Sequence, residues 1–475
     1  MRGPSTTSTT TRRSCAIPTG TTWKPSATTL SSSEPAVVGR LAERWARENP
    51  RSEALSTRAR RSLPAGVTHD VRRADPFSVA VATAAGSRKW DLDGHEIVCY
   101  VMGHGALLLG HSNAEVVAAI QEQAGRFLHA GASHELECDW AEAVVALVPS
   151  AEQVRFTSSG TEACTLALRL ARAATGRPRI AKLAGHFHGW GGQVAFGTDP
   201  PFSGPDTAGL PPGLRADVVV IPAEAEAVRE VLADGDVAAL ILEPSGAGWG
   251  MVPLPAGFLE EVRRLTLESG TVLIFDEVVS GFRWSPGGVQ QVAGVQPDLT
   301  ALGKVLAGGM PGGAVCGRAD LLGALALSRG DPRRVAHPGT HNAHPVAAAA
   351  GIATLRQVAS GGAQDSAARL AAELRRELSA VLGRCGVAGR AYGESSTFHL
   401  LLGHEGEPES LPLSELKAGL GPLLSSELHC GMLLGGVHLF HGSGFVSTAH
   451  CERDLGQTVE AFAATVPVLQ AEGLL

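Results

Sequence analysis

The chain has 475 residues, of which 44% are hydrophobic and 18% charged, so it is long enough for a large buried core and for more than one domain. A net charge of −7 without any block of Lys and Arg argues against nucleic-acid binding, and no run approaches the roughly 18 apolar residues of a membrane span. The eight cysteines contain no C-x-x-C pair, which excludes the common zinc spacings and a small disulfide scaffold, and we expect reduced thiols in a cytoplasmic protein.

Residues 1–36 form a segment of their own. The first 33 residues are rich in Ser, Thr and Pro, contain no acidic residue, and lack the apolar stretch of a secretory signal. A stretch this polar cannot bury enough surface to offset its chain entropy, so a disordered tail is predicted. A transit peptide, or a start codon placed too early, would have the same composition.

The two ends of the remaining chain mix helices with short strands. Residues 37–105 begin with a helical pattern and continue with strand-like runs at 77–84 and 89–91. Residues 346–475 begin with a helix, contain a long Ala/Leu/Arg helix at 362–383, and end in mixed α+β structure. We expect the two segments to pack together as one small α+β domain formed by both chain ends.

Residues 106–345 are predicted to form a large α/β domain. Helical stretches at 114–128 and 135–148 lead into the apolar strand 153–157. Further strand candidates are RIAKLAG, DVVVIP, VAALILEP, TVLIFDE and GGAVCGR. Several are nearly continuous in Val, Ile and Leu, which is typical of strands that helices cover on both faces. Their alternation with helices predicts a mainly parallel sheet.

In open α/β sheets, ligands gather at the carboxyl ends of the strands, and three polar features fall at such ends. The first is Ser158-Ser159-Gly160-Thr161, which lies between strand 153–157 and a helix. Backbone N–H groups and small hydroxyls at a helix N-terminus can hold an anion. The alternative interpretation is an ordinary helix cap by Ser or Thr.

The second feature is Asp276, which closes the apolar strand 272–275. A buried carboxylate is costly unless a cation or strong hydrogen-bond donors meet it. It could ligate a metal, act as a Walker-B acid with Glu277, or pair with a protonated heterocycle. The phosphate loop G-x-x-x-x-G-K-[ST] that a Walker-B acid requires is absent.

The third feature is Lys304, which follows a short apolar stretch and precedes a glycine-rich loop. An apolar setting lowers the pKa of a lysine and suits it to Schiff-base chemistry, whereas the alternative is a solvated surface lysine. An anion cradle, a buried acid and a desolvated lysine are together the three anchors that a pyridoxal 5′-phosphate (PLP) site requires. In such a site Asp276 keeps the pyridine nitrogen protonated, and Lys304 forms the Schiff base and moves protons on the substrate.

The blocks RFTSSGTEA, GHFHGW, LILEPSGAGWG, LIFDEVVSGFR, DLTALGK, PGTHNAHP and GFVSTAH occur in this order between about Leu63 and His450. In this respect the chain resembles the class III PLP-dependent aminotransferases of fold type I, and within them the branch of glutamate-1-semialdehyde 2,1-aminomutase. The resemblance implies a large domain with a mainly parallel seven-stranded sheet between helices, a small α+β domain from both chain ends, and a homodimer.

The resemblance also implies roles for single residues. By this resemblance, the phosphate is bound by Ser159, Gly160 and Thr161. Phe187 contacts one face of the cofactor ring, and Val278 contacts the other. Core packing is the alternative for both ring contacts. Thr340 matches a threonine that reaches the phosphate of the neighbouring subunit. Glu243 is implied to support the site through hydrogen bonds, and His188 has a weaker implied role. For Glu243 the alternative is a plain structural acid in a turn.

The substrate side departs from the family pattern. Where the aminomutases carry S-P-V-R, this chain has His69-Asp70-Val71-Arg72, so Arg72 could hold a substrate carboxylate or be an ion-paired surface residue. His104 stands in place of the family's tryptophan, and the late glutamate before G-F-V-S is missing from FHGSGFVS. A changed pocket could release the diamino intermediate that an aminomutase has to retain.

These observations predict an aminotransferase that works on an amino acid, with a β-amino acid or a specialised biosynthetic intermediate as candidate, and on a keto or aldehyde acceptor. The alternative enzyme is glutamate-1-semialdehyde 2,1-aminomutase or a related mutase. A non-catalytic regulator on the same fold is the third hypothesis. It is disfavoured because the N-terminal tail has no helix-turn-helix domain and because both Lys304 and Asp276 are present.

Overall fold

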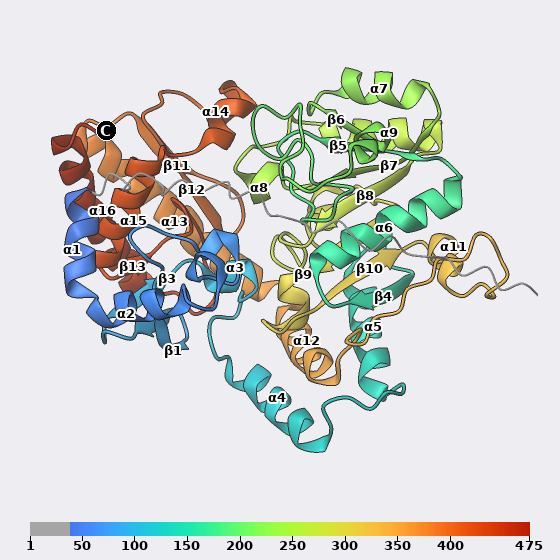
Figure 1. The fold of residues 1–475 in the computed structure, drawn as a ribbon, viewed down its shortest axis with the longest axis horizontal. Helices are drawn as coiled ribbons and strands as arrows, with labels where there is room; N and C mark the ends of the chain where they lie inside the picture. Colours follow the sequence, from blue (N-terminus) through green and yellow to red (C-terminus); the bar gives the residue numbers. More distant parts are fainter. Residues whose placement is uncertain (1–38) are drawn as a thin grey trace, which may run out of the picture. The chain divides into compact units, whose positions relative to one another are not determined.

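A seven-stranded sheet with the order β4-β10-β9-β8-β7-β5-β6 runs through the central part of the chain (Figure 1). The computed structural model describes residues 39–475, and the predicted tail at 1–36 lies outside the described residues. The strands from β9 to β6 are parallel, whereas β10 is antiparallel to both β4 and β9. The prediction of a mainly parallel seven-stranded sheet is therefore confirmed. In sheet order, the strands are β4 (Gln153–Thr157), β10 (Gly313–Gly317), β9 (Leu299–Gly303), β8 (Val272–Glu277), β7 (Val237–Leu242), β5 (Arg179–Leu183) and β6 (Val218–Ile221).

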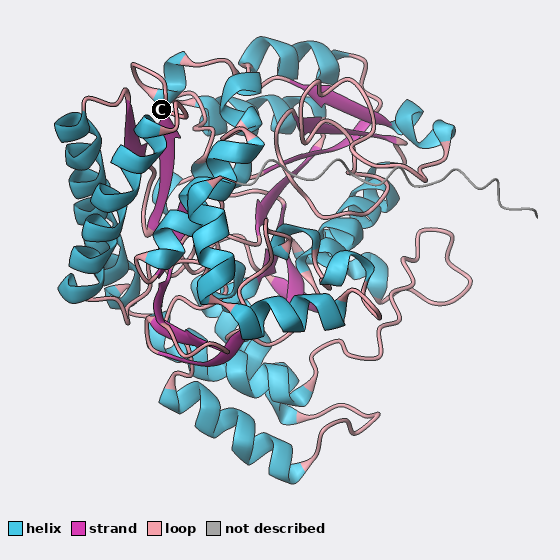
Figure 2. Ribbon diagram, turned by 60° about the vertical axis from the view of Figure 1, so that its left-hand side comes forward, coloured by secondary structure: helices cyan, strands magenta, loops and turns pink. Residues whose placement is uncertain are grey.

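Helices cover both faces of this sheet, as Figure 2 shows. One face packs against α6 (Gly160–Thr175), and the other packs against α7 (Ala225–Ala233) and α9 (Phe258–Ser269). All residues of β7 and β8 are buried, as expected for strands with apolar helices on each side. Short helices in the connections are α8 (Ala247–Gly250), α10 (Val289–Ala293) and α11 (Ala319–Leu322).

Both chain ends share a second core. Strands β1 (Val81–Ala85), β2 (Arg88–Asp91) and β3 (Glu96–Cys99) form a sheet with β13 (Val437–His438), which pairs in parallel with β3. A three-stranded sheet consists of β11 (Gly389–Tyr392), β12 (Thr397–Leu402) and β14 (Ser443–Phe445). The helices of this part are α1 (Arg40–Glu48), α2 (Pro50–Ala59), α13 (Gly362–Cys385), α14 (Leu413–Ala418), α15 (Pro422–Leu434) and α16 (Glu452–Ala471).

Single contacts tie the first helix to the last third of the chain. Glu427 of α15 accepts hydrogen bonds from the backbone N–H groups of Leu41 at 2.8 Å and Ala42 at 3.0 Å. These donors belong to the first turn of α1, where a helix has no acceptors of its own. The carboxylate of a distant helix therefore caps α1 and holds the N-terminal segment against α15.

Helix α12 (Pro345–Val358) packs against α4 (Ala114–Arg126) and α5 (Glu135–Leu147). Its apolar side chains share a cluster with Trp140 and Leu306. In α13, Ala367 still belongs to this cluster, whereas Leu370 belongs to the core of the chain ends. We therefore propose a boundary between the two cores inside α13, in place of the expected boundary at 346. Helix α3 (Met102–Gly105) lies where the chain leaves the N-terminal strands.

In the part of the chain that the structure describes, we find no helix that combines the length and the hydropathy of a membrane span.

Three histidines in the part built from both chain ends, of which His399 and His450 are buried and His429 is half-buried, make the folded state sensitive to acid. Burial lowers the pKa of His399 and His429 to about 3 and that of His450 to about 4. In the unfolded chain these groups titrate near 6.5, so below that pH the unfolded state binds more protons than the folded state. The free energy of unfolding is therefore expected to fall as the pH drops from about 6.5 toward 4, by up to roughly 1.4 kcal/mol per pH unit for each histidine.

Guanidinium unfolding at a series of pH values between 7.5 and 5 measures this slope. A His399→Gln variant removes one titrating group, and its slope should be shallower by about 1.4 kcal/mol per pH unit. An unchanged slope in the variant would show that His399 does not titrate with unfolding.

Candidate active site

The three polar features predicted at strand ends come together around one side chain, Val278. Strands β8 and β9 pair in parallel, with Asp276 opposite Ala301, so their carboxyl ends lie side by side. A Cβ atom on Gly160 would lie 2.7 Å from Val278 Cγ1, and one on Gly303 would lie 3.1 Å from the same atom. A side chain at Gly160 would collide with Val278 and one at Gly303 would crowd it, so the start of α6, the end of β8 and the residue before Lys304 are packed in contact.

The N-terminus of α6 has a reciprocal cap and two N–H groups left over. Ser159 Oγ accepts from Glu162 N at 3.3 Å, and Glu162 Oε2 accepts from Ser158 N at 2.7 Å. Ser159 caps the helix with its Oγ as acceptor, as the alternative interpretation predicts, and the hydroxyl hydrogen remains available to donate to an anion. The N–H groups of Gly160 and Thr161 find no acceptor among residues 39–475. They form an anion cradle at the positive end of a 16-residue helix.

Asp276 lies at the bottom of the site with three donors around its carboxylate. Its Oδ2 accepts from His188 Nδ1 at 2.8 Å and from Cys164 Sγ at 3.3 Å, and its Oδ1 accepts from Val278 N at 3.1 Å. The side chain is only 6% exposed. Because burial and the charge of Asp276 raise the pKa of the Cys164 thiol well above its usual range, this thiol stays a donor. The arrangement stabilises a carboxylate that faces away from water.

Lys304 begins a short helical turn directly after β9 with a backbone φ of +49°. A non-glycine residue in this left-handed region costs on the order of 1–3 kcal/mol, which is typical of functional sites. Burial lowers the pKa of its ammonium group, while the negative charges of Asp276 and Glu243 act in the opposite direction. A larger fraction of the amine is therefore neutral and nucleophilic than in an exposed lysine.

Glu243 organises the loop that carries Phe187. Its Oε1 accepts from Phe187 N at 2.9 Å and from Gly248 N at 3.2 Å, and its Oε2 accepts from Trp249 N at 3.0 Å. Burial raises the pKa of this carboxyl group. The ring of Phe187 is 56% exposed, so it is not a core residue in this chain. Thr161 packs beneath the same loop, because a Cβ atom on Gly189 would lie 2.3 Å from Thr161 Oγ1.

Two expected site residues lie apart from this group. Thr340 is exposed on the segment before α12, where its carbonyl oxygen accepts from His129 Nε2 at 2.6 Å. Arg72 lies in a short 3-10 turn and donates from Nη1 to Thr68 Oγ1 at 3.2 Å. Among residues 39–475, no carboxylate lies within ion-pair distance of Arg72.

Sequence reasoning missed Arg283, which joins the two cores beside the site. Its Nη2 donates to the carbonyl of Gly105 at 2.7 Å, and its Nη1 donates to Ser396 Oγ at 2.9 Å and to the carbonyl of Val446 at 3.3 Å. The guanidinium also lies 5.1 Å from the ring centre of Phe445, and burial lowers its pKa to about 9. An arginine inside the apolar run VVSGFRW was the available signal, because a buried guanidinium needs several acceptors.

Known proteins match most of the chain. The family model for class III aminotransferases matches residues 70–388. A glutamate-1-semialdehyde 2,1-aminomutase of Akkermansia muciniphila is 38% identical, over 86% of this chain and 97% of its own length. A transaminase solved with PLP bound is 33% identical and has a TM-score of 0.82, with 90% of this chain and 99% of that chain covered. A glutamate-1-semialdehyde aminomutase structure from Pseudomonas aeruginosa is 25% identical with the same TM-score of 0.82, over 90% and 97% of the two chains.

The residues present fit PLP. The cofactor has a phosphate, an aromatic ring with a basic nitrogen, and an aldehyde. The free N–H groups at the start of α6 suit the phosphate, the exposed ring of Phe187 suits the flat face, and the buried carboxylate of Asp276 suits a protonated ring nitrogen. The amine of Lys304 suits the aldehyde. With its fold type I architecture and with relatives of this similarity, the chain belongs to the class III aminotransferase family of PLP-dependent enzymes.

Proposed function

We propose that the chain is an aminotransferase that moves an amino group between an amino acid and a keto or aldehyde acceptor. A β-amino acid or a specialised biosynthetic intermediate is the proposed substrate class. The observation that carries the proposal is the packing of the start of α6, the end of β8 and the residue before Lys304 around Val278. This packing puts an anion cradle, a buried carboxylate and a desolvated amine at one place.

When bound, PLP supplies an aldehyde that takes up the amino group and a protonated ring that accepts the electrons released at the substrate carbon. Ser159, Gly160 and Thr161 bind its phosphate. Phe187 and Val278 enclose the ring from its two faces. Asp276 holds the proton at the ring nitrogen, and His188 fixes the orientation of that carboxylate through the 2.8 Å hydrogen bond.

Lys304 carries the proton in this proposal. Its partly neutral Nζ would anchor the cofactor's aldehyde and would act as the base that accepts the proton from the substrate carbon that carries the amino group. Glu243 positions Phe187 through the backbone hydrogen bond and adds a negative charge near Lys304. Arg72 holds the substrate carboxylate. It is available to do so because no carboxylate of the described residues forms an ion pair with it.

We also propose a homodimer in which Thr340 completes the phosphate site of the partner. Thr340 is exposed, and its carbonyl oxygen accepts a hydrogen bond from His129. Apolar surface that suits such an interface includes Trp190, 82% exposed, and Leu128, 59% exposed.

A second candidate function is the intramolecular transfer of glutamate-1-semialdehyde 2,1-aminomutase. The relative from Akkermansia muciniphila with that name, 38% identical, favours it. The substrate side favours the transferase, because His104 replaces the family's tryptophan and the glutamate before G-F-V-S is missing. Both differences change the surroundings that an aminomutase uses to retain its diamino intermediate.

An amino-donor screen with the purified holoenzyme, with and without pyruvate or 2-oxoglutarate, separates the two activities. A transferase converts donors only when an acceptor is present, and the acceptor appears as its amino acid. A mutase converts glutamate-1-semialdehyde alone, with no effect of an added keto acid. Acceptor-independent conversion as the sole activity would contradict the proposed transferase.

A further inference from the structure

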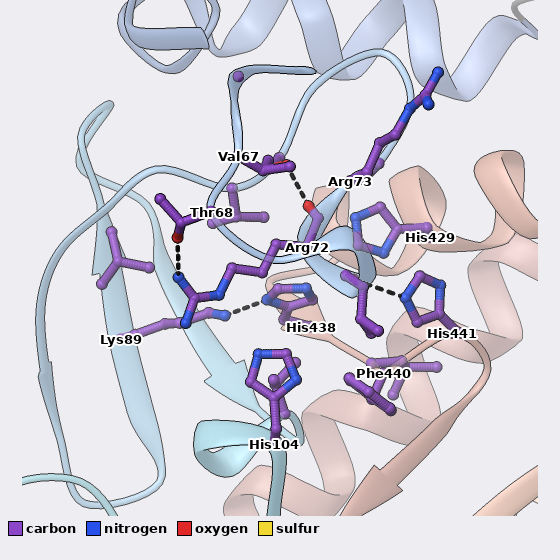
Figure 3. Close-up of a pocket in the computed structure, with 18 of the residues that line it drawn as sticks. Val67, Thr68, Arg72, Arg73, Lys89, His104, His429, His438, Phe440 and His441 are labelled. Carbon is purple, nitrogen blue, oxygen red and sulfur yellow. Dashed lines mark hydrogen bonds between the residues drawn. The ribbon is translucent and has the colours of Figure 1, made fainter. Parts of the chain in front are cut away.

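A cavity of about 340 Å³ lies between the N-terminal segment 63–104 and the segment 429–441 (Figure 3). Its polar wall is formed by cationic and imidazole side chains, and neither Asp nor Glu lines it. The remaining wall is aliphatic and aromatic. The polar residues used below are Arg72, Lys89, His104, His429, His438 and His441.

Lys89 is the unusual member of this wall. It lies on β2, is only 5% exposed, and its Nζ is hydrogen-bonded to Nδ1 of His438 on β13. Burial lowers the pKa of the ammonium group, and within residues 39–475 Lys89 forms no ion pair. A buried cation without a carboxylate partner is costly, so a bound anion would stabilise this arrangement.

The acidic groups that face Lys89 lie outside the cavity. Asp91 on the same strand already has three hydrogen-bond donors. Its carboxylate accepts from Asp93 N at 3.0 Å, from His95 N at 2.8 Å and from His95 Nδ1 at 2.9 Å. Cys99 on β3 is the other such group. Burial raises the pKa of its thiol, but the charges of Lys89 and of a neighbouring histidine outweigh burial and bring that pKa down to about 7. Neither group lines the cavity.

Arg72 adds a second cation to the same wall. Figure 3 shows the side chains of Arg72, Lys89 and His104 directed toward one another, whereas Arg73 is directed away. Arg72 has no carboxylate partner in the described part of the chain. The cavity thus offers two basic side chains without a carboxylate partner among the described residues, and a ligand with two acidic groups would complement them.

His429 and His438 stay neutral and act as hydrogen-bond groups. Burial and then the charge of Lys89 lower the pKa of His438 well below its usual range, and burial lowers the pKa of His429 to about 3. The Nε2 atom of His429 is buried without a hydrogen-bond partner. Within residues 39–475, no group of three potential metal ligands is arranged to hold an ion, so these histidines do not form a metal site.

His104 connects the cavity to the proposed reaction site. Burial comes first among the causes that lower its pKa to about 4, followed by the charges of His69, Arg72 and Lys304. Since a charge acts strongly only over a short distance, both Arg72 and the reactive amine lie near His104. A substrate with its reacting carbon at Lys304 would extend past His104 into the cavity.

We propose that this cavity binds a dianionic substrate, in which Arg72 holds one acidic group and Lys89 with His438 holds a second. The inference rests on the proposed aminotransferase and narrows its substrate to an acidic amino acid or keto acid. The aliphatic wall, which includes Val79, Val101 and Leu439, suits the carbon chain between the two groups. Two carboxylates, or one phosphonate, would present this chemistry.

Calorimetric binding of unreactive acids to the holoenzyme tests the site without amino transfer. The dicarboxylates from malonate to adipate are compared with monocarboxylates of the same length, and methylphosphonate forms a third arm. Wild-type protein should bind its best dicarboxylate, or methylphosphonate, about 10- to 100-fold more tightly than the matched monocarboxylate, the range for one hydrogen-bonded charge. Whichever arm is tighter identifies the dianion. Equal affinities in all three arms would overturn the proposal.

Lys89→Met should reduce this preference to about threefold or less and leave monocarboxylate binding nearly unchanged. Lys89→Gln, which keeps a donor for His438 but removes the charge, serves the same purpose should the methionine variant not fold. Lys89→Arg should retain the preference. Arg376→Met is the matched control, because it removes an exposed positive charge whose ion pair is with Glu377 on α13. A preference that persists in both uncharged variants would show that the anion binds elsewhere.

Kinetics then link the cavity to the reaction. The kcat/KM for 2-aminoadipate, divided by the kcat/KM for norleucine, should fall about 10-fold or more in Lys89→Met, because the variant lacks the group that holds the second carboxylate. Failure of every donor to turn over would reject the proposed function while the binding result still stands. Turnover with no effect of Lys89 on the ratio would reject the cavity alone.

Discussion

Replacing Lys304 by Ala should lower turnover by at least about 10³-fold, because general acid–base catalysis alone is typically worth about 10²–10⁴ and the covalent anchor is lost as well. The protein should also lose the visible absorbance of covalently held cofactor. The variant should fold normally, since the side chain removed is a buried amine whose burial already lowers the pKa of its ammonium group. Absorbance spectra and steady-state rates with an active donor–acceptor pair measure both effects.

Two further measurements separate chemistry from structure at Lys304. Lys304→Arg retains a positive charge but cannot anchor the cofactor, so it should be as inactive as the alanine variant. Added methylamine or ammonium should restore part of the activity of Lys304→Ala, because a free amine can enter the space and carry the proton. Full activity in either variant would refute the proposed role of this amine.

The sequence was most informative where the fold repeats a simple physical rule. Strands β7 and β8 are continuous in apolar residues and are buried throughout, so both were predictable from composition. Asp276 and the turn at Ser159–Thr161 could be found because ligands gather where parallel strands end. Strand β9 was not among the predicted strands, because its five residues LTALG are short and end in glycine.

Contacts between distant segments could not be predicted from local patterns. His188 meets Asp276 across 88 positions of sequence, and Glu427 caps α1 across more than 380. Arg283 lies in an apolar run and Lys89 lies beside Arg88, and only the folded chain shows that each is buried with no carboxylate at ion-pair distance among residues 39–475. Side-chain burial of this kind depends on the packing of several elements, which propensity and periodicity do not contain.

The domain boundary near α12 could not be predicted from local patterns either. Its alanine-rich pattern resembles that of α13, so the sequence places both helices in one C-terminal segment. In the structure the buried alanines of α12 pack on Trp140 and Leu306, whereas most of α13 packs on the chain ends. Helix periodicity identifies a buried face but does not say which partner covers it.

Asp276→Asn should lower kcat/KM by about 10²–10⁴-fold and weaken cofactor binding, because an amide keeps the shape of the side chain but cannot hold a proton at the ring nitrogen. The amide oxygen can still accept from Val278 N, and the amide nitrogen can donate to Nδ1 of His188 in the other ring tautomer, so the fold of the site should persist. The charge of Asp276 also favours the protonated form of Lys304. Removing that charge should therefore lower the pKa of the Lys304 amine further.

The holoenzyme gives a spectroscopic readout of this substitution that is independent of rate. The ring nitrogen loses its proton together with the carboxylate, and the loss of that nearer positive charge should move the pH midpoint of the visible absorbance to higher pH in Asp276→Asn. Glu277→Gln is the matched control one residue further along β8. Its carboxylate accepts from Ser280 Oγ and Val289 N, both at 2.8 Å, so its loss should reduce stability without moving the midpoint. An unchanged midpoint and near-normal activity in Asp276→Asn would mean that the carboxylate does not act on the cofactor, and that the burial of this acid serves only to hold His188 and Cys164 in place.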